Sequence, residues 1–262
     1  MKYSLLVTVY NDEEYLPRCF DSVLSQRLVP DEIVVVNDNS SDDTGNIIDE
    51  YNFQHIFSSE PKHEQRWLNR VRAFKLGLSA LNNQTQFVLK VDADIIMVPD
   101  YASTLINHFR TNPNLAACSG ISNARQFHSL PRNGAIMYRR SAFDPDDIRE
   151  VYGWDRWASL WLLEQGFEVS FDETIIYEEL RDSVLTLREA FNAGTIRRQE
   201  RYPLRGVLIQ AMIQKGMKKI AFLNGYLNGR GPERHSVDFI RQYSKKEEAE
   251  RLSYIMKRLG IG

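Results

Sequence analysis

The sequence predicts an α/β protein with an open, mostly parallel sheet covered by helices on both faces. From residue 3 to about residue 180, short apolar runs alternate with segments in which apolar residues recur at helical spacing. The apolar runs are nearly continuous, which is typical of parallel strands buried on both sides. Their alternation with helical segments is typical of βαβ units, and therefore of a parallel sheet.

The first part of the chain repeats this pattern several times. Residues 4–9 form the first expected strand, and the helical pattern that follows it stops before Pro30. Further strands are expected at residues 32–36, 55–57, 87–91 and 116–121, and helices at about 45–51, 64–81 and 101–110.

The rest of the chain changes from mixed to mostly helical. We expect strands near residues 133–139 and 168–171, with a helix at 154–165 that Gly166 ends. Beyond them the pattern is helical. The sequence therefore predicts two parts, an α/β domain over residues 1–183 and a helical C-terminal region over residues 184–262.

Composition and charge narrow the class of protein. Hydrophobic residues make up 43% of the 262 residues, enough for a full core, and the formal net charge of −2 gives no reason to expect a nucleic-acid partner. Cys19 and Cys118 form no metal-binding pattern, so we expect reduced, structural thiols and a cytoplasmic protein. We expect no signal peptide and no membrane-spanning segment, because no apolar stretch has the required length.

Polar side chains follow three of the expected strands. Thr8 and Tyr10 end the first strand, Asp38 follows the second, and Asp92 and Asp94 follow the strand at residues 87–91. Ligands of open α/β sheets bind beyond the carboxyl ends of the strands. If these strands are parallel, the three clusters face one crevice.

Asp92 and Asp94 are the most informative of these residues. Two carboxylates one residue apart at the end of a buried strand repel each other, and a divalent cation relieves that repulsion. Mg²⁺ and Mn²⁺ prefer oxygen ligands and usually share them with phosphates. A turn or a helix cap also explains an isolated Asp-x-Asp, but directly after an apolar strand the metal site is the better interpretation. Asp38 fits either a solvated loop or a carboxylate that accepts a hydrogen bond from a nucleobase.

Four motifs occur in a fixed order. The first motif comprises residues 7–16 and 22–26. The second comprises residues 31–44 and contains Asn37-Asp38-Asn39-Ser40. The third is Val91-Asp92-Ala93-Asp94, and the fourth is Gly153-Trp154-Asp155. Together they resemble glycosyltransferase family 2, over about residues 3–180. The resemblance implies a GT-A fold and an inverting transfer of a sugar from a nucleotide-diphosphate sugar (a UDP- or GDP-sugar) to a hydroxyl acceptor, in glycan, polysaccharide or glycolipid synthesis. It implies a nucleotide-sugar-binding half at about residues 1–115 and an acceptor and catalytic-base half at about residues 116–183.

The resemblance also implies a role for each site residue. Thr8, Tyr10 and Asp38 would hold the nucleoside, with Asp38 on the base. Asp94 would be the main protein ligand of Mn²⁺ or Mg²⁺, and Asp92 would contact the ribose or the metal-bound phosphates. Asp155 would be the general base that takes the proton of the acceptor, with a helix cap as its alternative role.

The helix at residues 64–81 departs from the family pattern. Lys75 stands where many members have an asparagine, and Arg72 adds another positive charge. Both are candidates to bind the diphosphate, although a charged helix face is usually only solvated. Trp154 and Trp157 are candidates for a sugar-stacking wall at the acceptor site, with core packing as the alternative.

Basic and apolar residues are mixed in residues 197–241. Amphipathic basic helices can lie on anionic membranes, and members of the family often use lipid-linked acceptors. The alternative is that these helices pack on the α/β domain and expose their lysines to water. We expect weak peripheral association with the inner face of the membrane.

Two other functions fit part of the pattern. A nucleotidyltransferase-like enzyme also combines an α/β nucleotide fold with acidic metal ligands, but such enzymes usually have a glycine-rich loop where this chain has Tyr10-Asn11-Asp12-Glu13-Glu14. The other is a catalytically inactive nucleotide-sugar-binding module that kept the fold. The presence of Asp38, Asp92, Asp94 and Asp155 argues against such a module.

Overall fold

The computed structural model describes residues 1–262 except 60–62, 83, 124–128, 182–185 and 260–262. The chain forms two compact units, Met1–Asp182 and Ser183–Gly262, which are called the α/β unit and the helical unit below. The boundary predicted between residues 183 and 184 falls within residues 182–185, outside the described residues.

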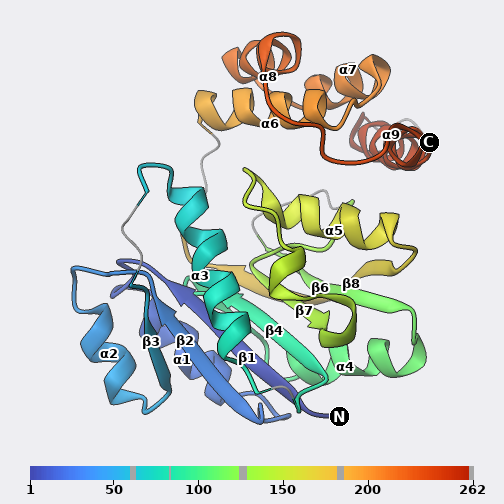
Figure 1. The fold of residues 1–262 in the computed structure, drawn as a ribbon. Coiled ribbons are helices and arrows are strands. Elements are labelled where there is room, and N and C mark those ends of the chain that lie inside the picture. The colour runs from blue at the N-terminus through green and yellow to red at the C-terminus, as the bar shows by residue number, and fades with distance from the viewer. Residues whose placement is uncertain (60–62, 83, 124–128, 182–185, 260–262) are drawn as a thin grey trace. The chain divides into compact units, whose positions relative to one another are not determined.

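A mixed sheet of eight strands forms the centre of the α/β unit (Figure 1). Its order is β3-β2-β1-β4-β7-β6-β8-β5. Strand β1 is parallel to β2 and β4, β2 to β3, and β6 to β8. Strand β7 is antiparallel to both β4 and β6, and β5 is antiparallel to β8. The strands are β1 (Tyr3–Val9), β2 (Glu32–Asn37), β3 (Gln54–Phe57), β4 (Phe87–Asp92), β5 (Ile95–Ile96), β6 (Leu115–Ser122), β7 (Ala135–Arg139) and β8 (Glu168–Glu179).

Helices cover both faces of the sheet, as the sequence predicts. Successive side chains of a strand point to opposite faces, and Leu5 and Val7 of β1 belong to one buried cluster while Leu6 belongs to the other. Helices α1, α2 and α4 contribute to the first cluster, and α3 and α5 to the second. The helices of this unit are α1 (Leu16–Leu24), α2 (Thr44–Glu50), α3 (Arg66–Ala80), α4 (Tyr101–Thr111) and α5 (Trp154–Glu164), with the short 3-10 helices η1 (Arg140–Ala142) and η2 (Pro145–Asp147).

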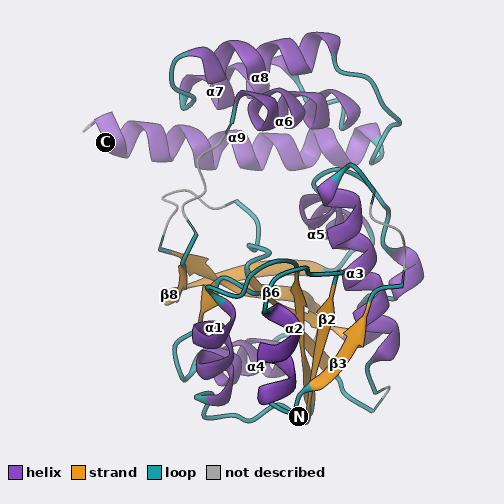
Figure 2. Cartoon of the chain, turned by 90° about the vertical axis from the view of Figure 1, so that its left-hand side faces the viewer, coloured by secondary structure: helices purple, strands orange, loops and turns teal. Residues whose placement is uncertain are grey.

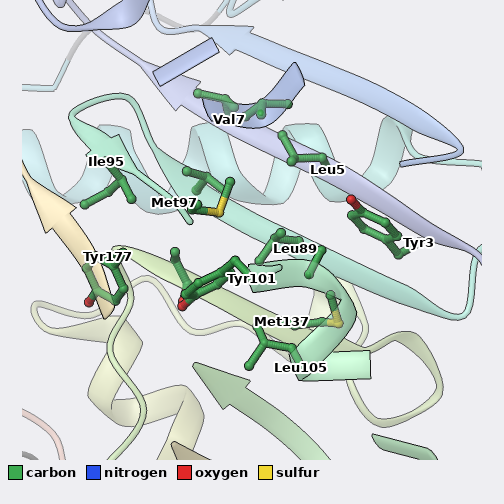
Figure 3. Packing of buried hydrophobic residues seen from close by; sticks show 14 of the residues in the cluster. Tyr3, Leu5, Val7, Leu89, Ile95, Met97, Tyr101, Leu105, Met137 and Tyr177 are labelled. Carbon is green, nitrogen blue, oxygen red and sulfur yellow. The ribbon is translucent and has the colours of Figure 1, made fainter. Parts of the chain in front are cut away.

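Tyr101 anchors helix α4 to the sheet. Its ring is buried in the first cluster, near Leu89 and Met137 (Figure 3). Its hydroxyl donates a hydrogen bond to the carbonyl of Ala135 at 2.6 Å and accepts one from the N–H of Gly120 at 2.7 Å. This side chain therefore ties α4 to both β6 and β7.

Helix α3 packs very closely on the opposite face. A Cβ added at Gly77 would lie 2.4 Å from a methyl group of Leu6 and 2.9 Å from one of Val36. Only glycine permits this approach. The contact holds α3 against β1 and β2, the strands whose carboxyl ends carry the predicted site.

The described residues of the second unit form four helices: α6 (Leu187–Gln199), α7 (Leu204–Met212), α8 (Met217–Asn228) and α9 (Val237–Leu259). Helices α6 and α8 cross closely, because a Cβ at Gly194 would lie 1.9 Å from the carbonyl oxygen of Phe222. Arg197 and Glu247 belong to a buried ionic cluster that links α6 to α9. Within the described part of the chain, no helix is long and apolar enough to cross a membrane.

Two features of the sheet differ from the prediction. Strand β8 does not stop at residue 171 but continues to Glu179, and its second half pairs with β6 through Ile176 and Tyr177. The two-residue strand β5 was not predicted, and it follows Asp94 directly. Both differences concern the edge of the sheet next to the acidic residues.

Candidate functional site

The carboxyl ends of three neighbouring strands bring the predicted polar clusters together. Thr8 of β1 is paired with Val36 of β2 on one side and with Asp92 of β4 on the other. The N–H of Asp38 donates to the carbonyl of Val9 at 2.9 Å. Because β1, β2 and β4 are parallel, Thr8, Asp38 and Asp92 lie at one edge of the sheet, where ligands of such sheets bind.

The loops after β1 and β2 are joined by hydrogen bonds. The N–H of Asn11 donates to Ser40 Oγ at 3.0 Å, and the N–H of Ser41 donates to Asn11 Oδ1 at 2.8 Å. Two residues on, the N–H of Asp43 donates to Glu13 Oε2 at 2.7 Å. The backbone of Asn11 is left-handed, with φ of 50°, which asparagine tolerates better than most residues. Asn11 and Glu13 therefore help to fix the two loops against each other.

The three side chains predicted to hold a nucleoside differ in accessibility. Asp38 is buried, with 9% of its surface exposed, whereas Tyr10 is exposed and Thr8 is half-buried. A carboxylate is costly to bury without hydrogen bonds, whereas the ring of Tyr10 is accessible from solvent. This gradient suits a pocket with a polar floor and an aromatic rim.

Asp92 is held by a lysine that was not predicted as a site residue. Lys90 lies two residues earlier on the same side of β4, and only 2% of its side chain is exposed. Its ammonium group pairs with Asp92 and donates to the carbonyl of Asn133 at 2.6 Å. Because a buried ammonium is costly without partners, this pair fixes the Asp92 carboxylate. Asp92 keeps 43% of its side-chain surface exposed, so a ligand can still reach it.

Asp94 lies in the turn between β4 and β5. Its carbonyl accepts a hydrogen bond from the N–H of Leu180 at 2.9 Å, and a quarter of its side chain is exposed. Burial raises the pKa of Asp94, the neighbouring charges of Asp92 and Asp12 raise it further, and Arg181 opposes them. A bound cation would favour the ionised form of this carboxylate.

Arg181 supplies a positive charge to the same place. Its guanidinium group pairs with Asp12 and lies 3.7 Å from Asp94. It also lies over the ring of Tyr15, 5.0 Å from the ring centre. Neither Asp12 nor Arg181 was predicted as a site residue.

The acidic residues fit a metal ion that is shared with a ligand. Among the residues that the structure describes, no three His, Cys, Asp or Glu side chains form a group that could hold a metal. Asp92 and Asp94 therefore supply only part of a ligand set. Mg²⁺ is commonly held by one or two carboxylates together with substrate phosphates and water. The carboxylates of Asp92 and Asp94, with the guanidinium group of Arg181 beside them, suit a cation that binds together with a diphosphate.

The two basic candidates on α3 contact the segment before α5. Arg72 Nε lies 3.1 Å from Glu150 Oε2, and Lys75 Nζ donates to the carbonyl of Ile148 at 3.4 Å. Both side chains are half-buried. In this structure they connect α3 to the chain that leads to Asp155.

Asp155 lies within the first turn of α5, where its negative charge is favoured by the helix dipole. The cap position itself is taken by Gly153, whose φ of 69° is left-handed, so Asp155 is not the cap. Burial raises the pKa of Tyr138, and the charges of Asp155 and Asp92 raise it further. The charges of both carboxylates therefore act on Tyr138.

The two tryptophans proposed for an acceptor wall are buried. Trp154 is 6% exposed and stacks on Phe74 with ring centres 4.8 Å apart. Trp157 is 1% exposed and lies 6.0 Å from Trp161. Their placement favours the alternative of core packing.

An open cavity lies elsewhere on the α/β unit. It is lined by Thr85, Gln86, Phe87, Arg139 and Arg140, at the amino end of β4. Because ligands of open α/β sheets bind at the opposite, carboxyl end, the acidic edge is the better candidate site.

Comparisons with known proteins agree on one family. A family model described as glycosyl transferase family 2 matches residues 4–163. The poly-beta-1,6-N-acetyl-D-glucosamine synthase of Staphylococcus epidermidis is 32% identical over 127 residues, 48% of this chain and 30% of the synthase. The putative glycosyltransferase EpsH of Bacillus subtilis is 31% identical over 116 residues, 44% of this chain and 33% of EpsH. The chain thus spans about a third of the length of these two relatives.

Solved structures share the fold at low sequence identity. The mannosyltransferase PcManGT from Pyrobaculum calidifontis, in complex with GDP-Man and Mn²⁺, matches with a TM-score of 0.62 and 14% identity, over 100% of this chain and 76% of that one. S. aureus TarS 1-349 in complex with UDP matches with a TM-score of 0.56 and 18% identity, over 87% of this chain and 71% of TarS 1-349.

Proposed function

Since this chain belongs to glycosyltransferase family 2 and has a GT-A fold, we propose that it transfers a sugar from a UDP- or GDP-sugar to a hydroxyl acceptor in glycan, polysaccharide or glycolipid synthesis. The observation that carries this proposal is the meeting of Thr8, Asp38 and Asp92 at one edge of the sheet, with Asp94 in the next turn. In this proposal residues of about 1–115 bind the donor, and residues of about 116–183 provide the acceptor side and the base.

The donor nucleoside binds over β1 and β2. The buried carboxylate of Asp38 accepts a hydrogen bond from an N–H of the base, Thr8 lies beneath the nucleoside, and the exposed ring of Tyr10 covers it. Hydrogen bonds to a charged acceptor are stronger than those between neutral groups. Asp38 would therefore contribute both affinity and discrimination between bases.

Asp94 is the main protein ligand of Mn²⁺ or Mg²⁺, and Asp92 assists it. Lys90 holds one oxygen of Asp92, so the exposed remainder of that carboxylate faces the metal-bound phosphates or the ribose. When bound, the cation neutralises the charge that grows on the departing diphosphate. Arg72 and Lys75 add positive charge on the α3 side of the donor.

Asp155 is the general base of an inverting displacement. Its carboxylate takes the proton of the acceptor hydroxyl while the hydroxyl oxygen bonds to the anomeric carbon. The bond from that carbon to the diphosphate oxygen breaks at the same time, and the nucleoside diphosphate leaves with the electron pair. Asp155 comes from α5, a different element from the strands that bind the donor, so base and leaving group can lie on opposite sides of the sugar.

We place this reaction on the cytoplasmic side of the membrane. Cys19 and Cys118 are both free and buried, which suits a reducing compartment. Peripheral association with the inner face would bring the enzyme to a lipid-linked or glycan acceptor.

Melting curves with UDP, GDP, CDP and dTDP, each with and without Mn²⁺, test the donor site. A ligand that binds only the folded state stabilises it by about 2.7 kcal/mol at a hundred times its dissociation constant. We expect one nucleotide to raise the melting temperature, and Mn²⁺ to enlarge the shift. If no nucleotide raises the melting temperature in either condition, the chain does not bind a nucleotide donor at this site, and the proposed function is rejected.

A further inference from the structure

The helical unit exposes two rows of apolar side chains. On α7, Leu204, Leu208 and Met212 recur every four residues and are 50–61% exposed, so they form one stripe. On α8, Met217, Ile220 and Leu227 lie on one side of the helix and are 59–62% exposed. Exposed apolar rows of this kind often mark an interaction site.

These rows do not contribute to the core of the unit. Other side chains of the same helices are buried there, among them Val207, Ile209 and Phe222. Gly225 of α8 approaches the backbone of α6, where a Cβ would lie 1.9 Å from the carbonyl oxygen of Phe191. Figures 1 and 2 show α7 and α8 together, with α6 and α9 on one side of the pair. The core of the helical unit is therefore formed without the side chains of the two exposed rows.

The charged residues around α7 and α8, between Glu200 and Glu233, are all basic. No acidic residue occurs between Glu200 and Glu233. Lys215 and Lys219 are exposed and Lys218 is half-buried, and all three lie where α7 turns into α8. The positive charge thus lies beside both apolar rows.

We propose that this α7–α8 surface binds an anionic lipid bilayer. It comprises Leu204, Leu208, Met212, Met217, Ile220, Leu227 and the lysines Lys215, Lys218 and Lys219. Apolar side chains on such a surface enter the boundary between headgroups and acyl chains, and lysines contact the anionic headgroups. With 9 and 12 residues, α7 and α8 are too short to span a bilayer, so the contact is peripheral.

The charge of this surface also favours an anionic bilayer over a second copy of the chain as its partner. Two copies joined through the same surface would bring their lysines together, and like charges oppose such a contact. A bilayer with anionic lipids supplies both the apolar phase and the negative charge. The proposal rests on the helical unit alone and does not depend on the reaction proposed for the α/β unit.

Co-sedimentation of the full chain with lipid vesicles tests the proposal. Vesicles would contain phosphatidylcholine either alone or with about 30% phosphatidylglycerol, to mimic an anionic leaflet. We expect binding to the anionic vesicles at low salt and its loss at about 1 M salt, where the Debye length is only about 3 Å. Binding to the neutral vesicles should be much weaker.

Paired variants separate the apolar and charged contributions. Leu208→Gln with Met212→Gln should reduce binding at least tenfold, whereas Val29→Gln, an exposed apolar residue of the α/β unit, should leave it unchanged. Lys215→Gln with Lys219→Gln should weaken binding about fivefold per lysine. The same changes at Lys245 and Lys246, exposed on α9, should have little effect.

Insertion can be followed at one residue. Both natural cysteines are buried, so a Leu208→Cys variant can be labelled with a polarity-sensitive fluorophore. Its emission should shift to the blue on anionic vesicles, and that of a labelled Lys245→Cys variant should not.

Several results would overturn the proposal. One is a wild-type protein that stays in the supernatant with anionic vesicles at low salt. Another is equal binding by the Leu208→Gln/Met212→Gln variant. Self-association that this variant abolishes, without vesicle binding, would instead show a contact between copies. A nucleotide-induced melting shift with no vesicle binding would leave the donor site in place and reject only the lipid surface.

Discussion

The guanidinium group of Arg181 lies 3.7 Å from the carboxylate of Asp94, the proposed main metal ligand. The same group pairs with Asp12. The chain therefore supplies a cation of its own to the acidic edge of the sheet. A divalent cation that binds Asp94 has to share this carboxylate with Arg181 or displace it.

Replacing Arg181 should make the protein more responsive to metal. In an Arg181→Gln variant the carboxylates of Asp12, Asp92 and Asp94 lose a neighbouring positive charge. We expect the free energy of unfolding of the chelator-treated protein to fall by only about 1 kcal/mol, because the Arg181–Asp12 pair is partly exposed. Mn²⁺ alone should restore much of this loss. Melting curves with chelator and with Mn²⁺ measure both effects.

Arg27→Gln is the matched control for Arg181→Gln. Arg27 pairs with Asp100 at 2.7 Å, and both side chains are largely exposed. Its replacement should change stability little, with the same response to Mn²⁺ as the wild type. An equal Mn²⁺ response in the two variants would show that Arg181 does not compete for the metal site.

Two buried tyrosine hydroxyls should differ in what they contribute. Tyr138 is fully buried, and its hydroxyl has no hydrogen-bond partner among the described residues. Tyr138→Phe removes an unsatisfied polar group, so we expect unchanged or higher stability. Tyr101→Phe removes a hydroxyl that makes hydrogen bonds at 2.6 and 2.7 Å, and should cost about 1–3 kcal/mol. Urea unfolding of both variants checks this order, and equal losses would contradict it.

The close crossing of α6 and α8 should not tolerate a side chain. A Cβ at Gly194 would meet the backbone oxygen of Phe222, which no side-chain rotation can relieve. We expect Gly194→Ala to destabilise the helical unit by about 3 kcal/mol. Thermal loss of helical circular dichroism measures this. In the control Gly45→Ala the nearest atom to the new Cβ lies 3.7 Å away, so the free energy of unfolding should stay within about 1 kcal/mol of the wild-type value. A Gly194→Ala variant that melts like the wild type would refute the close packing.

Asp172 should make stability depend on pH. Burial opposes its ionisation, but hydrogen bonds from Thr174 and His108 prevail and lower the pKa of Asp172. Because the folded pKa lies below the unfolded one, ionised Asp172 stabilises the fold above about pH 4, and this contribution is lost as the pH falls through the folded pKa. Asp172→Asn should therefore cost about 1–3 kcal/mol near pH 7.

Urea unfolding over a series of pH values tests the role of Asp172. The difference between wild type and Asp172→Asn should shrink below about pH 4. Asp100→Asn, which removes an exposed ion pair, should cost less than about 1 kcal/mol at neutral pH. A difference for Asp172→Asn that does not change with pH would show that its charge is not what stabilises the fold.

The sequence predicts the central strands well because their signal is local. The apolar runs at residues 4–9, 32–36 and 87–91 agree with β1, β2 and β4 to within one residue. The second half of β8 was missed because Asp172, Glu173 and Thr174 resemble a turn. The alternation of buried Ile175 and Tyr177 with exposed neighbours was the available signal for a strand. The antiparallel insertion of β7 between β4 and β6 depends on long-range pairing, which no local pattern contains.

The same distinction applies to the site. Thr8, Asp38 and Asp92 could be predicted because each lies at or directly after the carboxyl end of a strand of the parallel core. Lys90 carried a signal, since a lysine inside an apolar strand needs a partner two residues away or across the sheet. Arg181 gave no local signal in the sequence, because its partner Asp12 lies 169 positions away in the chain.

Calorimetric titration of the nucleotide that raises the melting temperature tests the central claim most directly. With Mn²⁺ present, the wild type and Asp100→Asn should bind it equally, and Asp94→Asn should bind it at least tenfold more weakly. Without Mn²⁺ the three proteins should bind it alike, because Asp94 acts through the metal. Equal affinity of Asp94→Asn and the wild type in the presence of Mn²⁺ would contradict a metal-assisted donor site at this edge of the sheet.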